Sequence, residues 1–269
     1  MIYRSIMVQL DPYDPIEAKV RFAWQLAGRF EADLIGLAAC DIPIAPMVFA
    51  TGAVVDTELM ARQNEEIEKR LATVKEEFMA LAKDSSRASW RGAVGNANHF
   101  LARQARAADL IVVGPSHDGP GSVEVGEAAL AAGRPLLLPA GDMKPLQASR
   151  VVIAWKDARE ARRAVVDALP FMSDADEVLV VSVDEDGSAR DGLSDIVRYL
   201  IKHGVKARAQ LVAAGEGTVG EIVVSRALEI GADLVVSGAF GHSRLREWIL
   251  GGATRSLIAD QRLHRFLSN

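Results

Sequence analysis

The order of segments in the first half of the chain recurs in the second half, and this internal repeat constrains the fold more than any other feature. Residues 5–39 and 150–183 each begin with a short apolar run, pass through a polar turn into a stretch with helical spacing, and end in a second apolar run. Residues 107–119 and 231–243 also correspond to each other. Such alternation of β-branched runs and helical stretches is typical of βαβ units and a parallel sheet.

Each half is predicted to contain five parallel strands alternating with helices, which gives an α/β fold of two tandem doubly wound domains with helices on both faces of each sheet. The predicted domains are residues 1–147 and 148–269. We place the fifth strand of the first domain at 134–140. The fifth strand of the second domain is placed at 263–269, although this segment is short and polar for a strand.

The first half also carries an insertion. The two pairs of repeated segments are offset by 145 and 124 positions, so about 21 extra residues lie in the first half, and we place them within residues 41–83. The insertion begins as an apolar loop with prolines and continues as a long amphipathic helix. The predicted apolar face of this helix consists of Leu59, Ile67, Leu71, Val74, Phe78 and Leu81.

Composition excludes several classes of protein. The chain has 269 residues, of which 49% are hydrophobic, enough for one large core or two ordinary ones. A formal net charge of -5 gives no global reason to expect nucleic acid or an acidic membrane as a partner. A single cysteine excludes an intrachain disulfide, and the apolar runs are too short for a membrane span or a signal peptide. We therefore expect a cytoplasmic protein without a nucleic-acid or membrane partner.

The stretch from Ser237 to Arg255 follows an apolar strand and has glycines at positions 238, 241, 251 and 252. Backbone N–H groups and a helix N-terminus can bind a phosphate, and ligands of open α/β sheets bind beyond the carboxyl ends of strands. Ser243, Arg244 and Arg246 add donors and positive charge. Glycines are also common wherever a strand leads into a helix, so glycine content alone does not distinguish a phosphate site from an ordinary loop.

The repeat and this loop resemble the universal stress protein family in its tandem form, with two such domains in one chain. Nucleotide-binding members carry a Gly, two residues, a Gly, nine residues, and a Gly followed by Ser or Thr. Gly238, Gly241 and Gly251 keep this spacing, whereas Gly252 replaces the hydroxyl residue. The resemblance covers nearly the whole chain and implies an adenine nucleotide alpha hydrolase-like fold. It also implies that the two domains pair as in the family's homodimer, and that the ligand is ATP, with Mg²⁺, or a related adenine nucleotide.

In nucleotide-binding members, an Asp at the end of the first strand meets the adenosine part of the ligand. The first half has Asp11 at this point, for which an N-cap of the first helix is the favoured alternative role, and the second half has Lys156. Lys156 either reaches a ligand or is a surface residue, and Val183 contacts adenine by resemblance alone. The residues predicted to bind the nucleotide are Gly238, Gly241, His242, Ser243, Arg244, Gly251, Gly252, Ala253, Thr254, Arg255, Lys156 and Val183.

The equivalent loop of the first half departs from the family pattern. Gly114 matches the first glycine, His117 replaces the second, and Gly126 matches the third only if one residue is deleted. Glu127 then stands where a phosphate would be held, with Glu124 nearby, and carboxylates repel phosphate. We therefore expect the first half not to bind ATP in the manner of the family.

No catalytic constellation stands out in the sequence. Ser116 and His117 follow a strand, but their spacing differs from that of a nucleophile elbow and adjacent side chains diverge. The five histidines show no metal-ligand spacing, and Cys40 is more typical of a small buried residue than of a nucleophile. We therefore predict no metal site, and at most slow hydrolysis of ATP.

The predicted function is that of a stress-response sensor or adaptor that binds an adenine nucleotide in its second domain and thereby changes a surface for an unidentified protein partner. One alternative is a nucleotide-free interaction protein that acts through residues 41–83. Another is an enzyme or a binder of small hydrophobic ligands that uses a cavity under this insertion. The two domains are expected to form an intrachain pseudo-dimer, with a homodimer of whole chains as a further option.

Overall fold

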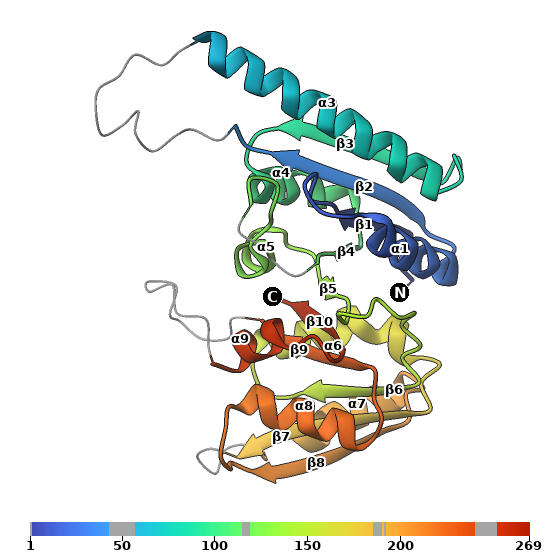
Figure 1. The fold of residues 1–269 in the computed structure, drawn as a ribbon. Coiled ribbons are helices and arrows are strands. Elements are labelled where there is room, and N and C mark those ends of the chain that lie inside the picture. Colours follow the sequence, from blue (N-terminus) through green and yellow to red (C-terminus); the bar gives the residue numbers. More distant parts are fainter. Residues whose placement is uncertain (1, 43–56, 115–118, 185–189, 191, 240–251) are drawn as a thin grey trace, which may run out of the picture.

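The computed structural model describes residues 2–42, 57–114, 119–184, 190, 192–239 and 252–269. Within them, ten strands form one sheet in the order β3-β2-β1-β4-β5-β10-β9-β6-β7-β8 (Figure 1). The strands are β1 (Ser5–Gln9), β2 (Asp33–Cys40), β3 (Ala88–Val94), β4 (Leu110–Val112), β5 (Leu136–Leu138), β6 (Arg150–Ala154), β7 (Glu177–Asp184), β8 (Ala207–Ala213), β9 (Leu234–Gly238) and β10 (His264–Ser268). The helices are α1 (Glu17–Phe30), α3 (Thr57–Leu81), α4 (Ala97–Gln104), α5 (Val125–Ala131), α6 (Arg159–Met172), α7 (Leu193–Lys202), α8 (Val219–Glu229) and α9 (Gly252–Ala259), with a short 3₁₀ helix η1 (Ala105–Ala107).

The predicted α/β fold is confirmed, and both halves have the same strand order. Each half reads third, second, first, fourth and fifth strand from the outer edge inward. Neighbouring strands are parallel within each half, whereas β5 and β10 pair antiparallel where the halves meet. The two halves are therefore joined through their fifth strands into one continuous sheet.

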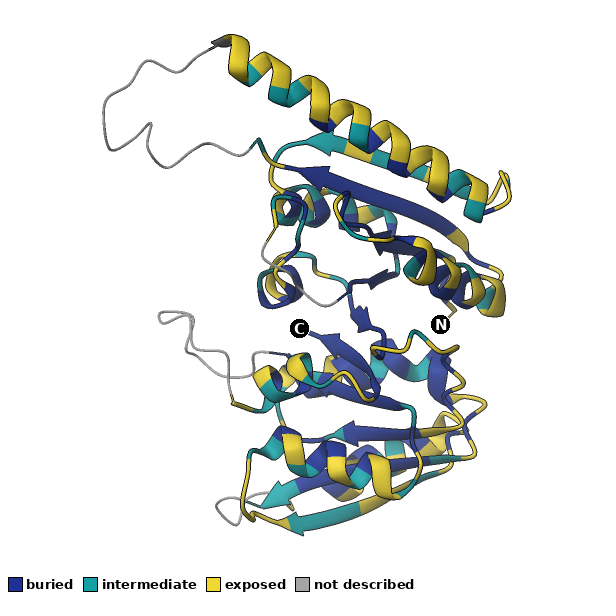
Figure 2. Cartoon of the chain, viewed as in Figure 1, coloured by how far each residue is buried: buried dark blue, intermediate teal, exposed yellow. Residues whose placement is uncertain are grey.

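Helices cover both faces of this sheet, but the cores on the two faces differ. Side chains beneath α1, α3, α6 and α7 form one hydrophobic cluster that continues across the junction of the halves. On the opposite face, α4 and α5 cover one cluster and α8 and α9 cover another. Figure 2 shows the central strands fully buried and the outer strands β3 and β8 partly exposed. The first of these clusters thus gives the two halves a common core, and Ala239 and Leu267 of the second half also belong to the cluster beneath α4 and α5.

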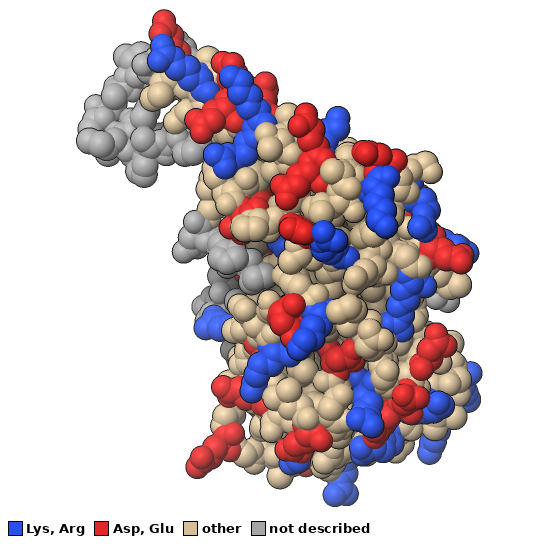
Figure 3. All heavy atoms as spheres, turned by 45° about the vertical axis from the view of Figure 1, so that its right-hand side comes forward, with Lys and Arg blue, Asp and Glu red and all other residues tan. Residues whose placement is uncertain are grey.

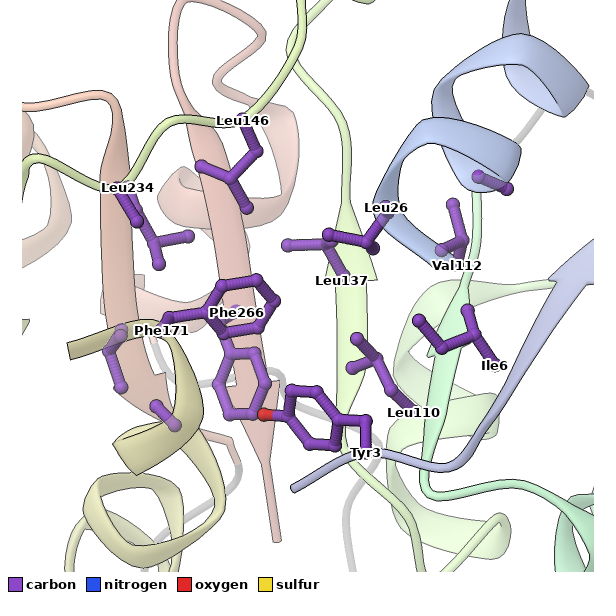
Figure 4. Close-up of a cluster of buried hydrophobic side chains, with 14 of the residues drawn as sticks. Tyr3, Ile6, Leu26, Leu110, Val112, Leu137, Leu146, Phe171, Leu234 and Phe266 are labelled. Atoms are coloured by element: carbon purple, nitrogen blue, oxygen red, sulfur yellow. The ribbon is translucent and has the colours of Figure 1, made fainter. Parts of the chain in front are cut away.

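Aromatic side chains form the centre of this common core (Figure 4). The ring of Phe171 on α6 lies 5.5 Å from Tyr3, 5.3 Å from Phe30 and 6.0 Å from Phe266, measured between centroids. Tyr3 and Phe30 belong to the first half, and Phe266 lies on β10. The hydroxyl of Tyr3 also donates a hydrogen bond to the backbone carbonyl of Asp167 on α6. Because these contacts cross from one half to the other, we expect the halves to unfold together.

The predicted fifth strand at 263–269 is confirmed by β10, and its polar side chains have partners at the centre of the sheet. His264 Nδ1 accepts a hydrogen bond from the N–H of Ala140 in the first half, at 3.1 Å. Ser268 Oγ donates to Asp167 Oδ2 at 2.7 Å. Buried polar groups are tolerated when they are hydrogen-bonded, which explains why a polar segment can occupy an interior strand.

Because of His264, we expect the protein to lose stability as the pH falls below about 6.5, the usual pKa of histidine. Its imidazole is buried and stacks on Phe22 of the first half, with the ring centroids 5.2 Å apart. Burial lowers the pKa of His264, Arg265 lowers it further, and Asp233, Asp142 and a backbone contact from Lys144 oppose this shift. With a lowered pKa in the folded state, the unfolded state binds more protons, so the free energy of unfolding decreases as the pH falls.

This pH dependence can be measured by urea unfolding at pH 7.5 and pH 5.5. In His264→Gln, an amide oxygen can still accept the hydrogen bond from Ala140, but the side chain does not titrate. We expect this variant to lose less free energy of unfolding than the wild type between the two pH values. Equal losses in both proteins would contradict the assignment to His264.

Asp109 and Asp233 occupy equivalent positions in the repeat and perform the same structural role. Asp109 Oδ2 accepts hydrogen bonds from the backbone N–H groups of Arg4 and Ser5, at 2.8 and 3.1 Å. Asp233 Oδ2 accepts from the N–H groups of residues 147–148, at 2.8 and 3.0 Å. Each carboxylate therefore fixes the segment that leads into the first strand of its own half.

The inserted helix is confirmed as α3, which packs on the outer part of the first half. Of its predicted apolar face, Ile67, Leu71, Val74 and Phe78 are buried and Leu81 is partly buried. The prediction for Leu59 is wrong, because its side chain is 53% exposed. Figure 1 shows the start of α3 projecting past the end of β3, so the sheet does not reach this part of the helix. The apolar loop predicted within the insertion lies mostly outside the described residues.

Candidate functional site

The strand order of the second half reverses between β6 and β9, and open α/β sheets bind ligands at the carboxyl ends of the strands at such a point. Lys156 follows β6 and is exposed, and Gly238 is the last residue of β9. Helix α9 starts at Gly252 and follows β9 in the chain. The topology thus brings Lys156, Gly238 and the first turn of α9 to one edge of the sheet.

Five of the predicted site residues lie outside the part of the chain that the structure describes. They are Gly241, His242, Ser243, Arg244 and Gly251. The site is therefore built here from the other seven, which are Gly238, Gly252, Ala253, Thr254, Arg255, Lys156 and Val183.

Gly238 has a structural reason to be glycine. A Cβ placed on it would lie 2.6 Å from the backbone nitrogen of Ala161 and 2.7 Å from the carbonyl carbon of Glu160. The end of β9 therefore packs directly against the first turn of α6, at a distance that only glycine permits. This contact brings α6 close to the crevice between β6 and β9.

Helix α8 fixes the start of α9. A Cβ on Gly220 would lie 2.7 Å from the carbonyl oxygen of Ala253, so the two helices pack closely at their N-terminal ends. The Oγ1 of Thr218 lies 2.8 Å from the Oγ of Ser256, and Ser256 Oγ donates to the carbonyl of Gly252 at 3.0 Å. Thr218 also forms a capping box with Glu221, which fixes the beginning of α8. These contacts place the first turn of α9 firmly, and its N–H groups have no partners within an α-helix.

Charges of both signs lie around this first turn, because Glu221 is bonded to Thr218, which in turn contacts Ser256 of α9. Arg255, the fourth residue of α9, is exposed, and side chains on a helix tilt toward its N-terminus. Asp157, next to Lys156, lies 3.5 Å from Arg162 in an ion pair, so a cation offsets its charge. Thr254 is buried, and Val183 is partly buried near the end of β7. Over the face drawn in Figure 3, acidic and basic side chains are interspersed.

In the first half, a lysine occupies the equivalent crevice. The Nζ of Lys19 lies in the space that a Cβ on Gly114, after β4, would fill. Burial lowers the pKa of Lys19, and the carboxylates of Asp14 and Asp11 oppose this shift. Lys19 is the third residue of α1, and the third residue of α6 is Ala161. In the second half, the space beside Gly238 is taken by the backbone of Glu160 and Ala161 instead of by a lysine side chain.

Asp11 does not cap the first helix, so that prediction is wrong. The N-cap of α1 is Ile16, which makes no side-chain cap hydrogen bond. Asp11 instead closes a local turn, because its Oδ1 accepts from the N–H of Tyr13 at 2.9 Å. Its carboxylate also packs against Gly121, where a Cβ would lie 2.6 Å from Oδ1.

The first half has a carboxylate at the helix start that corresponds to the start of α9. Glu124 is the N-cap of α5, and its Oε2 accepts from the N–H of Glu127 at 2.6 Å. Gly126 lies inside α5 and Glu124 takes the position before the helix, whereas Gly251, to which Gly126 was matched, lies outside the described residues. Asn98 of α4 binds the N–H of Glu124 at 2.9 Å. An internal anion thus caps this helix.

Some residues that shape the two crevices were missed from the sequence. Thr218 and Glu221 form a Ser/Thr-x-x-Glu capping pattern that the sequence does show, whereas the role of Lys19 depends on which face of α1 meets β4. Trp155, next to Lys156, is buried, and its Nε1 has no hydrogen-bond partner among the described residues. Such unpartnered buried donors are uncommon in proteins.

Among the described residues, no group of histidine, cysteine and carboxylate side chains is arranged to hold a metal ion, and no helix is long and apolar enough to span a membrane. Cys40 is buried, as predicted, and Ser116 and His117 lie outside the described residues. A cavity of about 360 Å³ lies between α3 and the turn after β1, and most of its lining residues are charged. This lining does not suit a hydrophobic ligand.

Similar architectures are found among solved structures. A universal stress protein from Archaeoglobus fulgidus superposes with a TM-score of 0.77 at 14% sequence identity, over 98% of both chains. A functionally unknown protein from Pseudomonas aeruginosa gives a TM-score of 0.62 at 14% identity, over 99% of this chain and 92% of the other. A candidate universal stress protein from the same species gives 0.62 at 13% identity, over 99% and 93%.

Comparison of the sequence alone finds no matching family model and no matching curated protein. The structural likeness extends over whole chains. The chain therefore has the universal stress protein fold in its tandem, two-domain form.

Proposed function

We propose that this chain, which has the fold of a tandem universal stress protein, binds ATP with Mg²⁺ in the crevice of its second half and acts as a stress-response sensor or adaptor. The observation that carries the proposal is the difference between the two crevices. In the first half, Lys19 fills the crevice and Glu124 caps the adjacent helix. In the second half, the backbone of Glu160 and Ala161 lies beside Gly238 instead of a lysine side chain, and α9 starts with two small residues, Gly252 and Ala253.

The first turn of α9 would hold the phosphate groups. Its N–H groups point out of the helix start, and the helix dipole favours negative charge there. Arg255 and Lys156 add positive charge at the same edge of the sheet, and a Cβ on Gly252 would meet no atom of the described residues within 4 Å. The choice of adenine rests on the resemblance to universal stress proteins, which also assigns Val183 a backbone contact with the base.

A sensor requires the bound and free states to differ at a surface that a partner recognises, and the ligand must favour one of them. The described residues support binding more than catalysis. Phosphate contacts would come from the first turn of α9, whereas the carboxylates of Asp157 and Glu160 are each paired with an arginine and that of Glu221 caps α8. We therefore propose nucleotide-dependent signalling with hydrolysis, if any, as a slow side reaction.

Isothermal titration with ATP and Mg²⁺ tests this assignment through Arg255→Ala. We expect the variant to bind ATP about tenfold more weakly, because a hydrogen bond to a charged group contributes about 1.5–3 kcal/mol. Arg262→Ala is the matched control. Arg262 is exposed, lies beyond the other end of α9 and pairs with Asp260 at 2.6 Å.

Three results would count against the proposal. The absence of heat from wild-type protein at millimolar ATP would rule out nucleotide binding. Equal weakening by Arg255→Ala and Arg262→Ala would indicate a general effect of charge. Unchanged affinity in Arg255→Ala would place the nucleotide away from α9.

A second candidate function rests on α3. Apart from the contacts beneath its buried face, this helix is exposed along most of its length and projects past the sheet (Figures 1 and 2). A nucleotide-free interaction protein could use this surface for its partner. Loss of partner capture on changing exposed α3 residues, in a protein that binds no ATP, would favour this alternative.

A further inference from the structure

Arg265 on β10 is buried, and its guanidinium makes hydrogen bonds only to backbone carbonyls among the described residues. The residue is 1% exposed and is the largest fully buried residue in the part of the chain that the structure describes. Its Nη1 donates to the carbonyls of Pro139 and Leu263, both at 2.7 Å. Its Nε donates to Leu257 at 3.1 Å, and its Nη2 to Ile258 at 3.4 Å. An arginine with four carbonyl partners in the interior is a specific structural device rather than general packing.

Two of these partners belong to the last turn of α9. Leu257 and Ile258 lie just before its final residue, Ala259. The last carbonyls of a helix have no partners within the helix, and the negative end of the helix dipole attracts a cation. Burial lowers the pKa of Arg265 to about 10, so the guanidinium stays charged at neutral pH. Arg265 thus acts as a buried cap for the C-terminal end of α9.

The same guanidinium reaches the first half of the chain. Pro139 directly follows β5, the strand that pairs with β10 at the junction. Helix α9 is therefore held at its end by the junction through Arg265, and at its start by α8 through Thr218 and Ser256. The orientation of α9 depends on both anchors, because a helix of eight residues is only about 12 Å long.

We propose that Arg265 is a positioning residue of the anion site: by tying the last turn of α9 to the β5–β10 junction, it keeps the first turn of α9 directed at the crevice between β6 and β9. This inference rests on the proposed function of the second half. It also makes the site depend on the first half, since Pro139 supplies one of the carbonyls that hold the guanidinium.

The test compares Arg265→Met and Arg265→Lys in the full-length protein. Two quantities are measured: the dissociation constant for ATP with Mg²⁺, and hydrogen exchange of the α9 amides. Methionine keeps much of the volume but removes every donor, whereas lysine keeps the charge and can reach fewer carbonyls. For Arg265→Met we expect faster exchange in α9 and about tenfold weaker binding, which corresponds to about 1.4 kcal/mol. For Arg265→Lys we expect about threefold weaker binding.

Phe171→Leu is the control for loss of stability alone. Phe171 lies in the aromatic cluster of the same junction, and its ring partners are Tyr3, Phe30 and Phe266 rather than residues of α9. A general loosening of the junction would weaken binding in this variant as well. If Arg265 positions α9 specifically, Phe171→Leu should bind ATP with wild-type affinity and show wild-type hydrogen exchange in α9.

The possible outcomes separate this inference from the proposed function. Wild-type affinity and exchange in both Arg265 variants would overturn the inference, as would equal weakening by Phe171→Leu. If Arg265→Met fails to fold, Arg265→Lys decides alone by the same criteria. If wild-type protein binds no ATP, the proposed function fails, and exchange in α9 still reports whether Arg265 holds the helix.

Discussion

Replacing Phe171 with alanine is expected to lower the free energy of unfolding by about 4 kcal/mol, near the upper part of the range for large core residues. Its ring is fully buried and touches aromatic residues from both halves of the chain. Removing it leaves a cavity at the point where the halves share their core. Denaturant unfolding at pH 7.5 measures the effect, and Leu228→Ala is the control because Leu228 is 42% exposed and should change stability by no more than about 0.5 kcal/mol.

The same experiment tests whether the two halves form one cooperative unit. A core that crosses the β5–β10 junction predicts one unfolding transition, which moves as a whole in Phe171→Ala. Two separate transitions, of which only one responds to the substitution, would mean that the halves fold independently. A loss no larger than that in Leu228→Ala would contradict the role given to the aromatic cluster.

Replacing Gly238 with alanine is expected to cost about 3 kcal/mol, because overpacking against atoms that cannot move away is strongly destabilising. The added Cβ would meet the backbone of Glu160 and Ala161 at 2.6 to 2.7 Å, and backbone yields less readily than a side chain. Gly252→Ala is the matched control. Among the described residues, a Cβ at Gly252 would meet no atom within 4 Å, and alanine favours a helix by up to about 1 kcal/mol, so stability should be unchanged or higher.

Comparing the two glycine variants shows whether Gly238 is required for packing independently of nucleotide binding. If Gly238→Ala were as stable as Gly252→Ala, the close approach of β9 to α6 would be wrong. If Gly238→Ala is destabilised as expected, the first glycine of the loop is required by packing whether or not a nucleotide binds. Thermal and denaturant unfolding of the two variants side by side decides this point.

The fold was largely predictable because the two halves of the sequence show the same order of predicted strands and helices. The character of β10 was harder to predict. His264, Arg265 and Ser268 are polar, and their partners, such as Ala140, Pro139 and Asp167, lie more than a hundred positions away for each of these pairs. A local pattern cannot show that a distant carbonyl or amide will satisfy a buried polar side chain. Only the junction of the two halves brings these groups together.

The candidate site was predictable to a lesser degree. Spacing singled out Gly238 and the start of α9 as a phosphate site, which stays a prediction. Of the glutamates noted in the first half, Glu124 caps α5. The filling of the first crevice by Lys19 was not predicted, because helical spacing alone does not fix which residue of α1 faces Gly114. The predicted burial of Leu59 was wrong for a similar reason. Its spacing fits the apolar face of the helix, but the sheet ends before the helix does, so the side chain is exposed.

The stoichiometry of ATP binding tests most directly whether the second half alone carries an open anion site. Isothermal titration of the full-length protein with ATP and Mg²⁺, after any bound nucleotide has been removed, should give one ATP per chain. This value follows if Lys19 and Glu124 close the first crevice while the first turn of α9 leaves the second one open. Two ATP molecules per chain would contradict the closure of the first crevice, and none at millimolar ATP would contradict the nucleotide site itself.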